Sequence, residues 1–389
     1  MSLQPDPVTQ AVRAGLGSDE GTGAVVPPIH LSTTYAFRAF GEKRPYDYSR
    51  SGNPTRDLLG KALADLEGGV GATIVATGMA AITLVGHLLP VGARIIAPHD
   101  CYAGTYRLFE AWQRRGELKC DFVDFGDAAA VRAALSRPAA LLWIETPSNP
   151  LLRITDIAQV AELGHAAGAL VAVDNTFLSP LWQKPLALGA DLVVHSTTKY
   201  LNGHSDVVGG AVIAATAELH EKVGWWANCM GLTGAAFDSY LTLRGLRTLS
   251  ARLEHHGRNA GRLAQWLQSQ PGVKRVFYPG LPTHPGHEIA ARQQQGFGAV
   301  VTLEIAGGHD AVRALVSQMK YFSLAESLGG VESLIAHPAT MTHAAMDPQA
   351  RARAGLTDGL LRLSVGIEAY DDLRDDFAAG LERARQATR

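Results

Sequence analysis

The chain has 389 residues, of which 47% are hydrophobic and 19% are charged, and its 35 basic and 37 acidic residues nearly balance. This length predicts two or three domains, and the apolar fraction is too high for an intrinsically disordered chain. The balance of charge removes any electrostatic reason to expect nucleic acid or an anionic membrane as a partner, so we expect neither.

Three cysteines, Cys101, Cys120 and Cys229, are too few and too scattered for a disulfide framework or a zinc cage, and we expect no metal site. An odd number of cysteines fits a reducing compartment. The polar start of the chain contains two prolines and does not resemble a secretory signal. No apolar run approaches the roughly 18 residues that span a bilayer. We therefore expect a cytoplasmic protein.

The first segment, residues 1–55, is rich in Pro, Gly, Ser and Thr and has no helical periodicity. We expect an extended arm, whose backbone groups need hydrogen-bond partners. Four aromatic residues of the arm, Tyr35, Phe37, Tyr46 and Tyr48, favour docking on another surface over a disordered tail.

The second segment, residues 56–248, alternates helical patterns with short apolar runs. Residues 56–68 have helical spacing and end on glycine, as many helices do. The apolar runs are rich in β-branched residues and nearly continuous in hydrophobicity, which is typical of strands buried on both faces of a parallel sheet. We expect a large three-layer α/β domain with a mostly parallel seven-stranded sheet. Its strands should lie within residues 71–77, 93–98, 118–125, 140–146, 169–176, 190–196 and 209–215.

The third segment, residues 249–389, follows a different order. A long polar helix over residues 249–270 precedes three strand patterns, at residues 273–280, 298–305 and 360–368, and a charged helix ends the chain. Few strands with flanking helices predict a smaller α+β domain.

Functional side chains in parallel α/β sheets gather where the strands end. Lys199 comes just after the run 190–196, and Asp174 lies near the end of the preceding run, 25 residues earlier. One βα unit between them would bring both to the same sheet edge. A Schiff-base lysine and an acid for the pyridinium nitrogen are what pyridoxal phosphate (PLP) enzymes require. The alternatives are a helix-capping or ion-paired lysine and a turn-capping aspartate.

Other residues near strand ends could serve such a cofactor. Gly78 opens a helix after a strand, and free N–H groups at a helix N-terminus bind phosphate. Ser196 and Thr198 could add hydroxyl donors, and Tyr102 could stack on a ring. Each of these signals is weak alone. Arg362 lies in an apolar strand, where a guanidinium is costly unless paired, and it suits bidentate capture of a substrate carboxylate. A structural ion pair is the alternative for Arg362.

Seven motifs taken together resemble one known family. They are YDYSRSGNPTR (46–56), ATGMAAI (76–82), ETPSNP (145–150), VDNTF (173–177), HSTTKYLNGHSD (195–206), AESLGGVESL (325–334) and RLSVGIE (362–368). In this order they are similar to the Cys/Met-metabolism PLP-dependent enzymes. The resemblance covers essentially the whole chain. It implies the fold type I (aspartate-aminotransferase-like) architecture of PLP-dependent transferases and the cofactor pyridoxal 5'-phosphate.

The resemblance also assigns roles around the cofactor. Lys199 would bind PLP covalently and move protons during turnover, Asp174 would pair with the ring nitrogen, and Tyr102 would stack on the ring as a second catalytic residue. The phosphate would be bound by Gly78, Met79, Ser196 and Thr198. Tyr48 and Arg50 would reach the phosphate of a neighbouring subunit, so the arm would help to build a homotetramer of two catalytic dimers with shared active sites.

On the substrate side, the resemblance implies that Arg362 and Asn149 bind the carboxylate of an amino acid. Arg107, Glu326 and Ser327 would line the substrate pocket. The family performs β-elimination, γ-elimination and γ-replacement on one scaffold. Members that perform β-elimination tend to carry an aromatic residue where this chain has Glu326, which disfavours that reaction.

Among the reactions of the family, the resemblance implies γ-replacement on O-succinyl-L-homoserine, or on the O-acetyl ester, by L-cysteine to give L-cystathionine for methionine biosynthesis. The alternative is γ-elimination of cystathionine to cysteine, 2-oxobutanoate and ammonia. Two other classes fit poorly. A nicotinamide-dependent dehydrogenase needs a GxGxxG spacing that TGMAAI lacks. A catalytically silent relative would lack the lysine or its acid, and both are present.

Overall fold

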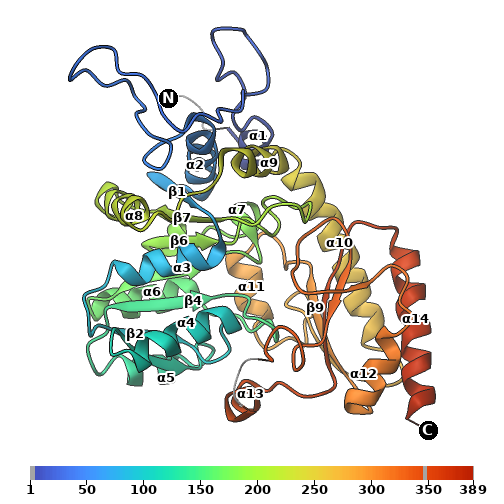
Figure 1. Ribbon diagram of the computed structural model, residues 1–389. Coiled ribbons are helices and arrows are strands. Elements are labelled where there is room, and N and C mark those ends of the chain that lie inside the picture. Colours follow the sequence, from blue (N-terminus) through green and yellow to red (C-terminus); the bar gives the residue numbers. More distant parts are fainter. Residues whose placement is uncertain (1–4, 345–347, 389) are drawn as a thin grey trace. The chain divides into compact units, whose positions relative to one another are not determined.

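The computed structural model describes residues 5–344 and 348–388 (Figure 1). The chain forms two compact units, residues 1–90 with 172–250 and residues 91–171 with 251–389. Among the residues described, no helix is both long and apolar enough to cross a membrane. The domain limits expected from the sequence, at residues 55 and 248, stay a prediction.

Seven strands form one mixed sheet, in the order β1-β7-β6-β5-β4-β2-β3. Parallel pairing joins β2 to β3, β2 to β4 and β5 to β6, whereas β7 runs antiparallel to both β6 and β1. The strands are β1 (Gly71–Val75), β2 (Arg94–Pro98), β3 (Lys119–Val123), β4 (Leu141–Glu145), β5 (Leu170–Asp174), β6 (Leu192–His195) and β7 (Gly210–Ala214). All seven predicted strands are confirmed, and so is the expected fold class.

The first unit contains one helix within the arm and the helices that follow the arm. They are α1 (Pro7–Val12), α2 (Pro54–Glu67), α3 (Gly78–His87), α7 (Ser179–Trp182), the 3₁₀ helix Pro185–Leu188, α8 (Ala217–Met230) and α9 (Ala236–Leu246). Helix α2 begins where the Asn53 side chain accepts the N–H groups of Thr55 and Arg56, and it ends at Gly68 in the left-handed conformation. In Figure 1 the segment before α2 runs as long loops that stand away from α2 and α9.

The second unit contains a second sheet, with the strand order β10-β11-β12-β9-β8. These strands are β8 (Val273–Phe277), β9 (Val300–Ile305), β10 (Ser323–Leu324), β11 (Leu334–Ala336) and β12 (Leu360–Ser364). Helices α12 and α14 pack side by side (Figure 1). The helices of this unit are α4 (Ala103–Arg114), α5 (Ala128–Ala134), α6 (Ile157–Ala166), α10 (Leu249–Leu267), α11 (His287–Gln293), α12 (Gly308–Val316), α13 (Pro348–Ala354) and α14 (Tyr370–Ala387).

The structure differs from the sequence expectations in four elements. Helix α1 lies in the arm, where no helix was expected; the Asp6 side chain caps it and Pro7 starts it. Strand β7 is antiparallel to β6, because a loop rather than a crossover helix joins the two strands. The short strands β10 and β11 were also not predicted, since two or three residues carry no detectable periodicity.

Candidate active site

Asp174 and Lys199 both lie where neighbouring parallel strands end, as the sequence predicts. Asp174 is the last residue of β5 and pairs in register with Val194 of β6. After β6 the chain turns sharply, and the Gly203 N–H donates to the Lys199 carbonyl at 2.8 Å. The Ser196 N–H donates to the Thr176 hydroxyl at 2.8 Å, which ties the two strand ends together. This edge of the sheet therefore carries both Asp174 and Lys199.

The surroundings of the Asp174 carboxyl shift its pKa in both directions, and the net shift is upward. Enclosure by protein raises its pKa, whereas a hydrogen bond from Thr176 and the charges of His195 and Lys199 act in the opposite direction. The Thr176 N–H donates to Asp174 Oδ1 at 3.0 Å. A cationic ring nitrogen beside this carboxylate would stabilise its ionised form further. The geometry therefore fits the pyridinium nitrogen of PLP.

The N-terminus of α3 forms a close cradle beside β6. The Thr77 hydroxyl caps the helix by accepting the Ala80 N–H at 2.9 Å. A Cβ atom added to Gly78 would lie 2.9 Å from Ser196 Cβ, so only glycine allows this approach. Thr198 lies nearby in the chain, and its hydroxyl accepts the Gly209 N–H at 3.0 Å. The backbone N–H groups at the start of α3, at Gly78 and Met79, suit a phosphate.

Tyr48 and Arg50 make contacts within the first unit. Arg50 Nη1 donates to the backbone and side-chain oxygens of Asn228, at 2.8 and 2.6 Å. Its guanidinium also lies over the Tyr48 ring, 5.6 Å from the ring centroid. Tyr48 itself is exposed.

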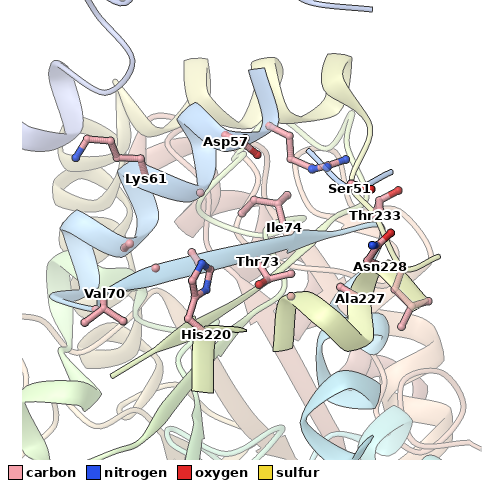
Figure 2. Close-up of a pocket in the computed structure, with 18 of the residues that line it drawn as sticks. Ser51, Asp57, Lys61, Val70, Thr73, Ile74, His220, Ala227, Asn228 and Thr233 are labelled. Carbon is pink, nitrogen blue, oxygen red and sulfur yellow. The ribbon is translucent and has the colours of Figure 1, made fainter. Parts of the chain in front are cut away.

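Arg50 and Asn228 border a cavity of about 530 Å³ in this unit. Figure 2 shows Asp57 and Lys61 of α2, Thr73 of β1 and His220 of α8 around it. The cavity is adjacent to the arm residues that the family resemblance singles out, and the described side chains around it carry charges of both signs.

In the second unit, Arg362 is at the centre of the predicted substrate-binding residues. It lies on β12 and is buried, and its Nη1 donates to Asn149 Oδ1 at 2.9 Å. Its Nη2 donates to the Ser327 carbonyl at 2.8 Å. Ser327 adopts a φ of +101°, which is strained for a residue other than glycine. The structure therefore holds three of the predicted residues in one hydrogen-bonded group.

Tyr102 precedes α4, and its ring is partly exposed. Burial and the charge of Glu326 raise the pKa of the Tyr102 phenol, while Arg107 and Arg362 oppose the shift. The charges of Arg107, Glu326 and Arg362 therefore lie within electrostatic range of the Tyr102 phenol. The roles that the family resemblance implies for these residues stay predictions.

Two buried groups beside these residues have no role among the sequence-based expectations. His343 Nε2 lies 3.1 Å from the Asn149 carbonyl, and burial lowers the pKa of His343 to about 4, so the imidazole is neutral at pH 7. Glu145 accepts the Tyr102 N–H. Its position at a strand end marks Glu145 as a candidate without indicating a role, and no sequence signal points to His343. Within residues 5–344 and 348–388, no cluster of three or more His, Cys, Asp or Glu side chains could hold a metal ion.

Comparison with known proteins gives one consistent result. The model of the family described as "Cys/Met metabolism PLP-dependent enzyme" matches residues 8–382. Cystathionine gamma-synthase of Escherichia coli is 56% identical over 97% of this chain and 98% of its own length. Cystathionine beta-lyase of Coxiella burnetii is 47% identical over 96% of this chain and 97% of its own length. The crystal structure of cystathionine gamma synthase from Xanthomonas oryzae pv. oryzae, in complex with aminoacrylate and cysteine, is 58% identical in sequence. It superposes with a TM-score of 0.97 over 98% of this chain and 99% of that chain.

Proposed function

The chain belongs to the Cys/Met metabolism PLP-dependent enzymes, and we propose that it catalyses γ-replacement on O-succinyl-L-homoserine, or on the O-acetyl ester, by L-cysteine to give L-cystathionine. One observation carries the proposal. Two cystathionine gamma-synthases, from Escherichia coli and Xanthomonas oryzae, are 56% and 58% identical to it over nearly the whole chain. The reaction would serve methionine biosynthesis.

PLP is the cofactor, and the residues of the first unit fit it. Bound PLP supplies an electron sink for negative charge that develops on substrate carbon atoms. Lys199 would carry it, Asp174 would neutralise its ring nitrogen, and Gly78, Met79, Ser196 and Thr198 would hold its phosphate. The close approach of Gly78 to Ser196 supports this assignment, since a phosphate needs backbone N–H groups at short range.

The protein's own groups then divide the work of the reaction. Arg362, held by Asn149 and Ser327, binds the α-carboxylate of the homoserine ester. The Lys199 amine takes a proton from the substrate Cα and returns one before product release. Tyr102 packs its ring on the cofactor and keeps its phenol protonated, because burial and nearby carboxylates raise its pKa. A bond from the substrate Cγ to the cysteine sulfur replaces the bond from Cγ to the ester oxygen. The acyl group leaves with that oxygen as succinate or acetate.

Tyr48 and Arg50 are proposed to act on the phosphate of a neighbouring subunit in a homotetramer. Arg50 would exchange its bonds to Asn228 for that phosphate, because a guanidinium binds a phosphate dianion more strongly than neutral amide oxygens. Mixing an Arg50→Ala variant with a Lys199→Ala variant should restore part of the activity. No rescue under conditions of proven subunit exchange would count against a shared site.

The proposal also includes the cytoplasm as the location, which the odd number of cysteines supports. Cys101 and Cys120 are buried free thiols, and Cys229 is an exposed one.

Lys199→Ala tests the proposed function directly, with Lys222→Ala as the matched control. Lys222 is exposed on α8 and forms an ion pair with Glu218 at 2.6 Å, and it has no part in the proposed reaction. Lys199→Ala should lose both the visible absorbance of the cofactor and cystathionine formation from O-succinyl-L-homoserine and cysteine. Lys222→Ala should keep both. A Lys199→Ala variant with full activity would overturn the assignment.

A further inference from the structure

Glu145 is a buried carboxylate that the proposed reaction does not use. It is the last residue of β4, whose five residues are all buried, and 6% of its surface is exposed. Its Oε2 accepts the Tyr102 N–H at 2.6 Å. Its Oε1 accepts the Thr105 hydroxyl and the Trp143 indole N–H, both at 2.9 Å. Three donors therefore converge on one carboxylate, which compensates the cost of burying it.

The start of α4 has no side-chain cap of its own, and Glu145 binds a backbone group there. Tyr102 stands at the N-cap position, but its side chain makes no capping hydrogen bond. A helix start leaves its first N–H groups without partners inside the helix. The Glu145 carboxylate supplies an acceptor from a separate strand, and a negative charge beside a helix N-terminus is favourable. Glu145 thus accepts the N–H of the N-cap residue itself, a group that no bond inside the helix satisfies.

This contact fixes the residue whose ring is proposed to face the cofactor. Glu145 accepts the backbone N–H of Tyr102, whereas 42% of the residue's surface remains exposed. Thr105, which also donates to Glu145, lies one turn along the same helix. Two bonds from one carboxylate to the first turn therefore restrict the Tyr102 backbone, and with it the direction in which the side chain leaves the chain.

We propose that Glu145 is a positioning residue, which holds the start of α4 so that the Tyr102 ring is oriented to stack on the cofactor. This rests on the role proposed above for Tyr102. Glu145 acts through the Tyr102 N–H and contacts no reacting atom. A carboxylate suits the position better than an amide, because an amide presents only one acceptor oxygen to three donors.

A double-mutant cycle on cofactor binding tests the proposal. The apoenzymes of wild type, Glu145→Gln, Tyr102→Ala and the double variant are titrated with PLP, and the circular dichroism of bound PLP is recorded. Glu145→Gln should weaken PLP binding about fivefold and change the dichroism of the bound cofactor. In the Tyr102→Ala background the same substitution should change affinity less than about twofold, because the group it orients is gone.

Thr105→Val is the matched control. It removes one donor to Glu145 but keeps the bond between Glu145 and the Tyr102 N–H, so PLP affinity should stay within about twofold of wild type. Equal effects of Thr105→Val and Glu145→Gln would mean that general loosening of the first turn, and not the Tyr102 contact, is responsible, which would overturn the proposal. Equal effects of Glu145→Gln in both backgrounds would also overturn it.

Two further outcomes separate this proposal from its premise. If Tyr102→Ala alone leaves PLP affinity and dichroism unchanged, the stacking role of Tyr102 fails, and the role of Glu145 fails with it. If Glu145→Gln does not fold, Glu145→Asp takes its place, because the shorter side chain keeps the charge but withdraws the acceptor from Tyr102. Unaltered PLP dichroism in Glu145→Asp would then refute the proposal.

Discussion

Replacement of Arg362 by lysine should separate carboxylate recognition from the rest of the site. The wild-type guanidinium donates one N–H group to Asn149 and one to Ser327, and it is proposed to bind the substrate carboxylate as well. A lysine ammonium has three donors at one point and cannot reproduce this planar arrangement. Each hydrogen bond to a charged group contributes about 1.5–3 kcal/mol. Loss of the bidentate contact should therefore cost about 3 kcal/mol, which corresponds to roughly a hundredfold loss in kcat/KM.

Steady-state kinetics with O-succinyl-L-homoserine and saturating cysteine measure this loss. Arg115→Lys is the control, because Arg115 is exposed and forms an ion pair with Glu117. We expect Arg115→Lys to match wild type, and we expect Arg362→Lys to retain PLP, since Arg362 is assigned to the substrate. A kcat/KM for Arg362→Lys within about threefold of wild type would refute the reasoning.

Three other predictions follow from local geometry. Gly78→Val should weaken PLP binding at least about tenfold in equilibrium dialysis, because even a Cβ would meet Ser196; unchanged affinity would contradict the phosphate cradle. Burial lowers the pKa of His256 to about 4 in the folded protein, whereas the unfolded chain takes up a proton near pH 6.5. The stability that neutral His256 contributes is therefore full above pH 6.5 and falls by up to about 3 kcal/mol as the pH drops to 4. Urea midpoints of His256→Gln should therefore fall less between pH 7.5 and 5 than those of wild type, and an equal fall would argue against this source of acid sensitivity. Ser327→Val should destabilise the protein by about 2 kcal/mol at its φ of +101°, whereas Ser327→Gly should not, and equal urea midpoints would show that the backbone there is unstrained.

The strands of the large sheet could be predicted because a strand that is buried on both faces consists of consecutive apolar residues. The run 190–196 contains β6, and the run 209–215 contains β7. Their relative direction could not be predicted from those runs, because it depends on whether the connecting chain crosses over or turns back. The six-residue helix α1 is too short for periodicity to reveal it, although its Asp6-Pro7 start is a recognisable signal.

The candidate site was predictable where a residue's position along a strand limits its chemistry. Asp174 and Lys199 follow this rule, since strand ends meet at one edge of a sheet. Arg362 and Asn149 are 213 residues apart, and only folding reveals their hydrogen bond. The roles of Glu145, which lies at a strand end, and of His343 could not be predicted for a related reason. Each contacts a backbone group of another residue, and the sequence does not indicate which backbone groups a fold brings near a side chain.

The most direct test of the central claim compares synthesis with cleavage in the same preparation. One reaction contains O-succinyl-L-homoserine and L-cysteine, and the other contains L-cystathionine alone. We predict rapid formation of cystathionine in the first reaction and little cleavage in the second. Release of cysteine with 2-oxobutanoate, or of homocysteine with pyruvate, from cystathionine without any synthesis would show a γ- or β-lyase instead and would contradict the proposed function.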